Sequence, residues 1–158
     1  MNSTYAGFWL RFVAVIIDYI IVYVLQSFVF VPVLGLMGIS FASKIDNMES
    51  MSDAEKMGMI GSIIAVGGAT ALLMQIIAIL YWTLMESSKY QATVGKLALG
   101  LKVTDLDGNS LDFVKSLIRN ICKIISQMIV FIGFIMAGFT EKKQGLHDII
   151  AGTLVVKK

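Results

Sequence analysis

The chain has 158 residues, of which 57% are hydrophobic and 15% are charged, and its mean hydropathy is +0.81. These values lie outside the range of soluble domains and indicate a single-domain membrane protein whose main partner is the lipid bilayer. The formal net charge is only +2 and the basic residues are scattered, so we expect no nucleic acid as a partner.

The first apolar segment, residues 8–37, is predicted to be a transmembrane helix. It is longer than the roughly 20 residues that cross a hydrocarbon core of about 30 Å, so we expect tilt or a kink, with Pro32 as the kink site. Arg11 and Asp18 interrupt the segment. They are two helical turns apart and project from nearly the same face, about 10 Å apart along the axis.

The two charges differ in how they can reach water. Arg11 lies beside Trp9, where its long side chain can reach the headgroups, so a membrane anchor is one interpretation. Asp18 is short and lies deeper, where a carboxylate costs on the order of 2.5 to 3.5 kcal/mol on insertion scales. We expect it to be either a functional group or a structural partner, as an ion pair or a protonated acid. Its candidate partners are Arg119, Lys123, Gln75 and a group near the carboxyl terminus.

An acidic outer loop, residues 38–58, leads into the second predicted transmembrane helix, residues 59–85. This helix is the clearest span and ends in the interfacial residues Tyr81 and Trp82. Small residues recur every four positions at Gly61, Ala65 and Ala69, which lets helices approach closely. The small-residue surface serves either a homo-oligomer or contact with the first helix of the same chain.

The cytoplasmic connector, residues 86–115, contains the alternating stretch LGLKVTD followed by DGN. This pattern predicts a short strand and a hairpin leading into a helix, and a calcium loop is much less consistent with it. Ser110 or Asp112 is expected to cap that helix. The helix has a basic face, formed by Lys115, Arg119 and Lys123, and is expected to lie at the inner membrane surface.

The third segment, residues 116–140, ends in an apolar run that suits either a short span or a re-entrant pair of helices bending at Gly133. Positive residues are concentrated between the second and third segments, so that region and the amino terminus are predicted to be cytoplasmic. The tail, residues 141–158, is also basic and is therefore predicted to lie on the cytoplasmic side. A re-entrant segment satisfies both observations, whereas a full span would leave a positive tail outside.

The tail contains His147, the only histidine, directly before Asp148. Histidine titrates near neutral pH, so His147 could relay protons, although a local hydrogen-bonding role is the simpler interpretation.

Three pieces of the chain together resemble the RDD family of small membrane proteins, which is named for one arginine and two aspartates. The pieces are YAGFWLRFVAVIIDYII, then MESSKYQATVGKLALGLKVTDLDGNSLDF with SLIRN after it, and finally QGLHDIIAGTLVV. In this resemblance Arg11 and Asp18 match the first arginine and aspartate, and Asp148 matches the second aspartate. The resemblance covers nearly the whole chain, and we expect residues 1–158 to form one all-α integral membrane domain in a bacterial inner (plasma) membrane.

The resemblance implies transport, including sodium and proton antiport, or an accessory membrane role. In a transporter, Asp18 would alternate between a proton and a monovalent cation, Arg11 would pair with the empty carboxylate, and Asp148 with His147 would serve the inner gate. The alternative is a structural, accessory or regulatory protein in which the same groups pair helices. We expect no enzyme activity, because the sequence has no metal cluster, no nucleophile with a neighbouring base and no nucleotide loop, and we expect no cofactor.

Overall fold

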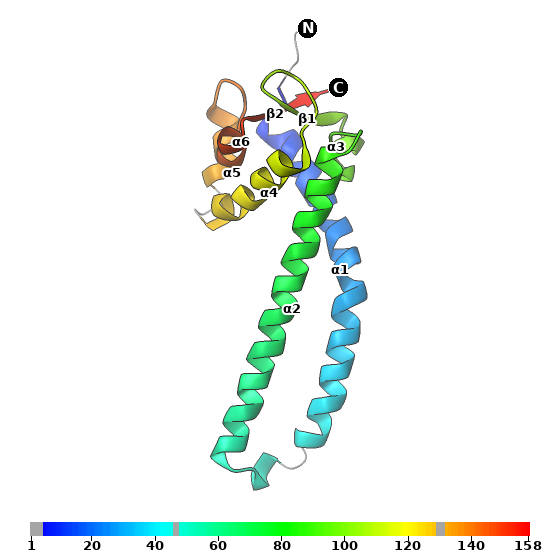
Figure 1. Cartoon of the computed structure of the whole chain (residues 1–158), viewed down its shortest axis with the longest axis vertical. Helices are drawn as coiled ribbons and strands as arrows, with labels where there is room; N and C mark the ends of the chain where they lie inside the picture. The colour runs from blue at the N-terminus through cyan, green and yellow to red at the C-terminus, as the bar shows by residue number, and fades with distance from the viewer. Residues whose placement is uncertain (1–4, 46–47, 129–131) are drawn as a thin grey trace. The chain divides into compact units, whose positions relative to one another are not determined.

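The computed structural model describes residues 5–45, 48–128 and 132–158, which are mostly helical, at 73%, with one small sheet (Figure 1). Two long helices are α1 (Phe8–Ile45) and α2 (Asp53–Ser87), joined by the short 3-10 helix η1 (Met48–Ser50). The shorter elements are α3 (Val94–Ala98), β1 (Leu101–Asp105), α4 (Phe113–Met128), α5 (Ile132–Phe139), α6 (Leu146–Ala151) and β2 (Thr153–Lys157).

The two predicted spans are confirmed as helices long and apolar enough to cross a membrane, over Phe8–Ala42 and Asp53–Ser87. Each of these stretches has 35 residues, or about 52 Å of helix at 1.5 Å per residue. Their large apolar side chains are mostly exposed: Tyr23 and Phe28 are each 74% exposed and Ile64 is 69% exposed. A core helix of a soluble protein would bury such side chains, so these surfaces are suited to lipid.

The third predicted span is not confirmed. The structure has two short helices in its place, α4 with 16 residues and α5 with 8, and neither is long enough to cross a bilayer. Gly133, the predicted bend, lies inside α5. The stretch between the two helices, residues 129–131, lies outside the described part of the chain.

Helix α4 is amphipathic, but its polar face is turned inward. Ser116, Arg119 and Asn120 are buried, whereas Ile118 and Ile121 are each 45% exposed. The prediction of a basic face at the membrane surface is therefore wrong for Arg119, which points into the protein. A helix that buries its polar face and exposes its apolar face is arranged for an apolar surrounding.

The connector contains the predicted strand, but the predicted hairpin is wrong. Strand β1 pairs antiparallel with the C-terminal β2, with Leu101 opposite Lys157 and Asp105 opposite Thr153. The DGN stretch is a turn, in which the Asp105 carboxylate accepts the N–H of Asn109 at 2.8 Å. It is followed by α4 rather than by a second strand, and Asp112 caps α4 as predicted, accepting the Lys115 N–H at 2.7 Å.

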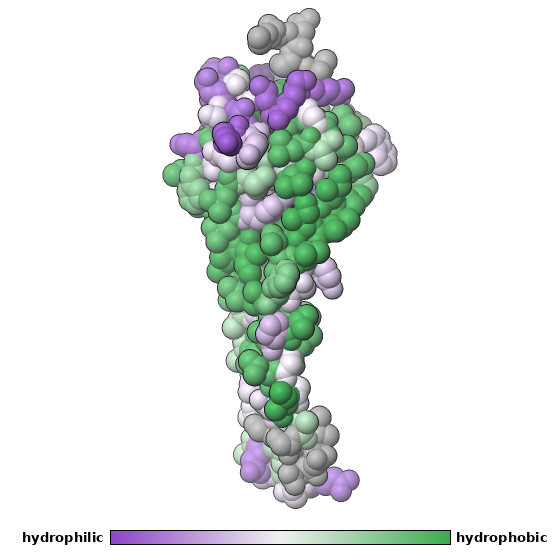
Figure 2. Space-filling view, turned by 90° about the vertical axis from the view of Figure 1, so that its right-hand side faces the viewer, coloured by the Kyte–Doolittle hydropathy of each residue, from purple (hydrophilic) through white to green (hydrophobic). Residues whose placement is uncertain are grey.

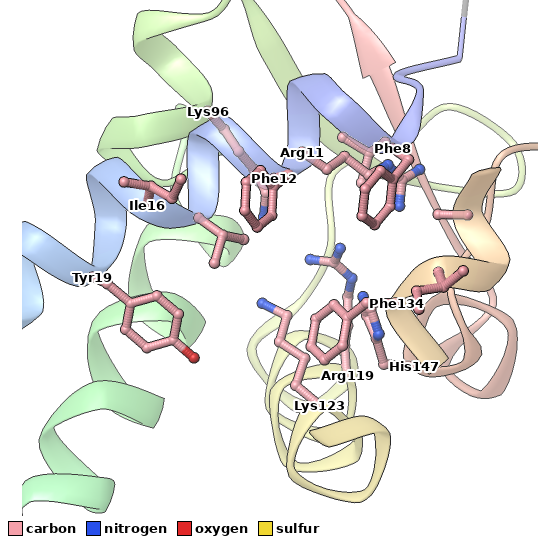
Figure 3. Close-up of a pocket in the computed structure, with 14 residues that line it drawn as sticks. Phe8, Arg11, Phe12, Ile16, Tyr19, Lys96, Arg119, Lys123, Phe134 and His147 are labelled. Carbon is pink, nitrogen blue, oxygen red and sulfur yellow. The ribbon is translucent and has the colours of Figure 1, made fainter. Parts of the chain in front are cut away.

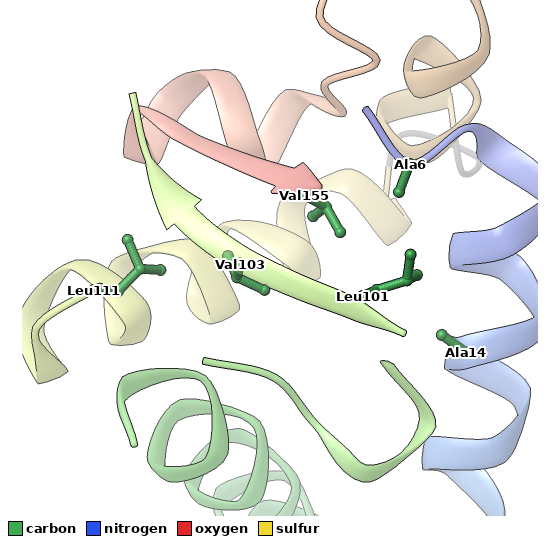
Figure 4. Close-up of a cluster of buried hydrophobic side chains, with 6 residues drawn as sticks. All are labelled: Ala6, Ala14, Leu101, Val103, Leu111 and Val155. Carbon is green, nitrogen blue, oxygen red and sulfur yellow. The ribbon is translucent and has the colours of Figure 1, made fainter. Parts of the chain in front are cut away.

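A small hydrophobic cluster holds the two strands against the start of α1 (Figure 4). Before α1 begins, Ala6 donates its N–H to the Val155 carbonyl at 2.9 Å, and Tyr5 forms a bridge with Val156. The beginning, the middle and the end of the sequence thus meet at one sheet. The cluster consists of buried residues: Ala6, Ala14, Leu101, Val103, Leu111 and Val155.

The chain divides into two compact units. Unit 1 comprises Met1–Ile21 and Ala78–Lys158, and unit 2 comprises Val22–Ile77. In unit 1, α4, α5 and α6 pack against one another. On the face shown in Figure 2, hydrophilic side chains gather at the end of unit 1 near the chain termini, and hydrophobic side chains form a broad band beside them. This distribution is typical of a protein at a membrane interface.

Candidate functional site

The inward polar face of α4 forms the centre of a charge network in unit 1. Arg119 is 1% exposed and bridges two fully buried carboxylates, Glu86 at the end of α2 and Asp148 in α6. Its Nη1 lies 2.6 Å from Glu86 Oε2, and its Nη2 lies 2.7 Å from Asp148 Oδ1. A single arginine therefore ties three helices together through ion pairs.

Glu86 is surrounded by cations. Besides Arg119 it pairs with Lys96 of α3 and with Lys123 of α4, whose Nζ lies 3.4 Å from Oε1. Asn120 donates to Oε2 at 3.2 Å. A buried carboxylate needs such partners, because an unpaired charge in a low-dielectric interior costs several kcal/mol.

Asp148 is held by side chains from α1 and α4 and by the backbone at the start of its own helix. Arg11 of α1 pairs with Oδ2, and Arg119 donates from Nε to Oδ1 at 2.8 Å. The Gly145 N–H, at the start of α6, also donates to Oδ2 at 3.1 Å. Burial alone would raise the pKa of Asp148, but the positive charges of Arg119 and Arg11 keep that pKa well below its usual range, so the group stays ionised.

His147 lies beside this pair, with Nε2 3.5 Å from Asp148 Oδ1 and its ring against Phe134. Burial lowers the pKa of His147 to about 3, although the Asp148 charge opposes the shift. The ring is therefore neutral at ordinary pH.

Asp18 has a different environment. It is 2% exposed and accepts three hydrogen bonds from neutral donors: the Thr93 hydroxyl at 2.5 Å, the Gly95 N–H at 2.8 Å and the Tyr81 hydroxyl at 3.1 Å. Within the described residues it makes no ion pair. Asp18 thus fixes the start of α3 to α1 through hydrogen bonds alone.

This junction requires glycine at position 95. A Cβ placed there would lie 2.1 Å from the Ala14 carbonyl oxygen and 3.0 Å from Asp18 Cγ. The close approach of the two backbones brings the Gly95 N–H within reach of the carboxylate.

A cavity of about 350 Å³ opens beside the network (Figure 3). Four cationic side chains, those of Arg11, Lys96, Arg119 and Lys123, contribute to its lining, and most of the remaining lining is apolar. In Figure 3, Arg119 and Lys123 extend from α4 towards the space below Phe12. The carboxylates of Glu86 and Asp148 do not line the cavity.

The structure brings together most of the residues predicted from the sequence, but in other pairs. Arg11 pairs with Asp148 and not with Asp18, so the two residues that share a helix face do not form an ion pair. Arg119 and Lys123 pair with Glu86 rather than with Asp18. Gln75 is exposed and belongs to unit 2.

Sequence reasoning missed Glu86. The available signal is a carboxylate directly after the apolar run of the second span, whereas Glu86 falls in the predicted connector. Thr93 and Asn120 were also missed, and Tyr81 was given only an interfacial role, because polar neutral side chains at a membrane border carry little signal.

The two lipid-suited helices, the inward polar face of α4 and the buried charges define an integral membrane protein. Residues 5–152 match the model of the RDD family, and the chain belongs to that family. Arg11, Asp18 and Asp148 are the residues that suggested it from sequence.

Three proteins are similar to this chain over nearly its whole length. The chain is 39% identical to the uncharacterized protein YxaI of Bacillus subtilis (strain 168), over 97% of each chain. It is 27% identical to the uncharacterized membrane protein YteJ of the same organism, over 99% of this chain and 83% of the relative. It is also 27% identical to protein FAM8A1 of Homo sapiens, over 94% of this chain but only 39% of that protein. No solved structure matches.

Proposed function

We propose that this protein is a non-catalytic membrane protein, structural or accessory in role, in which the RDD residues and their partners hold the helices of unit 1 together. The observation that supports this most directly is the bridge formed by Arg119 between Glu86 and Asp148, with Arg11 as a second partner of Asp148. Removing one charge from such a buried network leaves its partners unpaired, which costs about 3 to 5 kcal/mol. These groups are therefore suited to permanent pairing.

We further propose a bacterial inner (plasma) membrane with a cytoplasmic amino terminus. The support for this orientation is the basic connector, since positive residues favour the cytoplasmic side, and the two relatives from Bacillus subtilis.

A double-mutant cycle tests the structural role. Arg11→Gln, Asp148→Asn and the double variant are purified in detergent, and their thermal unfolding is compared with that of Lys142→Gln, a matched loss of an exposed charge. We expect each single variant to be strongly destabilised and the double variant to be less unstable than the sum, because neither charge is then left unpaired. Single variants as stable as Lys142→Gln would contradict the proposal.

A second candidate function is cation and proton exchange at Asp18. The specific support is that Asp18 is a buried carboxylate with oxygen-bearing neighbours, the hydroxyls of Thr93 and Tyr81, and no ion pair within the described residues. A proton or a hard monovalent cation such as sodium would supply the missing charge. Arg11 is engaged by Asp148, so exchange would depend on Asp18 without an arginine counter-charge.

A chain of this size would need to assemble to enclose a pathway. Gly61, Ala65 and Ala69 are exposed on α2 and support a proposed homo-oligomer.

Proton flux in proteoliposomes tests the exchange. The wild type, Asp18→Asn and the exposed control Asp107→Asn are compared on addition of sodium, lithium, potassium or no cation. Cation-dependent flux that is lost only in Asp18→Asn supports the carrier. Absence of flux from folded wild-type protein would reject the carrier and leave the structural proposal standing.

A further inference from the structure

The cavity in unit 1 has more positive charge around it than the network neutralises. Four cations line it, Arg11, Lys96, Arg119 and Lys123, and they share two carboxylates, Glu86 and Asp148. If the charge of Asp18, which makes no ion pair, is counted as well, one positive charge is uncompensated whenever Lys123 is protonated. Burial lowers the pKa of Lys123 to about 7, so a bound anion would favour its charged form. The cavity is therefore suited to an anion and unsuited to a metal cation.

Two of these cations also have hydrogen-bonding capacity left. Arg11 Nη2 and Arg119 Nη1 are buried without a hydrogen-bond acceptor among the described residues. Arg119 Nη1 lies 2.6 Å from Glu86 Oε2 and its charge is paired there, so Arg11 Nη2 is the clearer unsatisfied donor. Buried donors of this kind are expected to meet an acceptor, and guanidinium groups match phosphate oxygens well.

The remainder of the cavity is apolar, and its border is too. Phe12, Ile16 and Ile135 line it and are each nearly half exposed, so the cavity opens outward between hydrophobic side chains. A free inorganic anion gains nothing from such an entrance, whereas a molecule with an anionic head and hydrocarbon chains can satisfy both parts. The exposed apolar face of α4 shows that lipid is the expected surrounding of this region.

We propose that the cavity binds the headgroup of an anionic phospholipid. The phosphate contacts Arg119, Lys123 and Arg11, and an acyl chain leaves past Ile16 and Ile135. This inference does not depend on whether Asp18 exchanges ions, because Asp18 does not line the cavity.

Native mass spectrometry of the full chain in detergent tests the proposal. Phosphatidylglycerol and phosphatidylcholine with identical acyl chains are titrated separately, and inorganic phosphate is added as a competitor. Both headgroups carry the phosphate, but the choline of phosphatidylcholine adds a cation that the basic cavity repels. We therefore expect phosphatidylglycerol to be retained about tenfold more strongly. Equal retention of the two lipids would overturn the proposal, and displacement by millimolar phosphate would indicate a small-anion site instead.

Three variants locate the binding. Lys123→Gln removes a cation from the cavity, and Lys142→Gln removes an exposed one elsewhere. Because Lys123→Gln also affects the Glu86 network, Ile16→Trp provides a second variant that fills the cavity entrance and leaves every charge in place. We expect about tenfold weaker retention of phosphatidylglycerol in Lys123→Gln and Ile16→Trp, and no change in Lys142→Gln. Wild-type retention in Ile16→Trp would contradict the assignment of the cavity.

Discussion

The junction between α1 and α3 can be tested with one methyl group. In Gly95→Ala the new Cβ would lie 2.1 Å from the Ala14 carbonyl oxygen, 0.9 Å inside the 3.0 Å below which Cβ contacts are essentially never observed. A Cβ is fixed to its own backbone and its partner is a backbone oxygen, so no side-chain rotation can relieve the contact. Helix α3 must move away from α1, which separates Asp18 from the Gly95 N–H and the Thr93 hydroxyl.

The magnitude follows from those two hydrogen bonds. Each joins a neutral donor to a charged acceptor and contributes about 1.5 to 3 kcal/mol, so their loss costs about 3 to 6 kcal/mol. Replacing a helical glycine by alanine stabilises the helix by about 0.5 to 1 kcal/mol, which offsets part of this loss. The net loss of about 2 to 5 kcal/mol is a large share of the roughly 5 to 15 kcal/mol that stabilises a folded protein.

The measurement is thermal unfolding in detergent, with hydrogen exchange of the Gly95 region as a local readout. We expect the melting temperature to fall by roughly 5 to 20 °C for a protein of this size. Gly138→Ala is the matched control, because a Cβ there would make an ordinary contact, 3.8 Å from Phe8 Cβ, within helix α5. If both variants melted with the wild type, the close approach of α1 and α3 would be refuted.

Three further predictions follow from the site. Glu86→Gln leaves three buried cations short of a partner and should lower the unfolding free energy by about 3 to 5 kcal/mol, unlike the exposed Glu141→Gln; equal denaturation curves would contradict the network. Burial lowers the pKa of His147 from 6.5 to about 3, so the unfolded chain binds a proton that the folded chain excludes, and stability should fall by about 2 kcal/mol between about pH 6.5 and pH 5. His147→Gln should remove that dependence in unfolding measurements across this range, and an unchanged slope would refute the assignment. A spin label at Ile118→Cys in liposomes should be more accessible to oxygen than to an aqueous relaxation reagent, with the opposite result for Asp107→Cys; aqueous accessibility at both positions would show that α4 does not face lipid.

The helices were predictable because hydropathy is a local property. Both spans were located from apolar runs alone, although the second begins at Asp53, six residues before the predicted position 59. The start had a local signal: the Ser52 hydroxyl accepts the Glu55 N–H, and the Glu55 carboxylate accepts the Ser52 N–H at 2.8 Å, which is a capping box. The charges of that turn instead fall in the predicted acidic outer loop, residues 38–58.

The sheet was only half predictable. The alternation in LKVTD indicated a strand, but its partner, TLVVK, is about 50 residues further along the chain and looked like an apolar end of the tail. Strand pairing depends on contacts between segments distant in sequence. The turn at Gly108 suggested, wrongly, that the strand pairs with the residues directly after it. No local pattern distinguishes the two.

The sequence predicted which charged residues belong to the site but not which of them pair with one another. A carboxylate or guanidinium inside an apolar run is expensive wherever its partner lies, so Arg11 and Asp18 were visible from sequence. Which charges meet depends on the packing of α4 and α6 against the ends of the long helices. Helical spacing favoured an ion pair between Arg11 and Asp18, whereas in the fold Arg11 forms an ion pair with Asp148.

The inward polar face of α4 connects the charge network with the cavity. A helix whose exposed face is apolar must bury its polar face, and Arg119 and Lys123 on that face need carboxylates within the protein. Two such carboxylates serve four cations, so the arrangement that stabilises unit 1 also leaves positive charge beside a lipid-facing entrance. An anionic headgroup bound there would complete the pairing. Since a ligand that binds only the folded state stabilises it, phosphatidylglycerol should raise the melting temperature of the wild type more than that of Ile16→Trp.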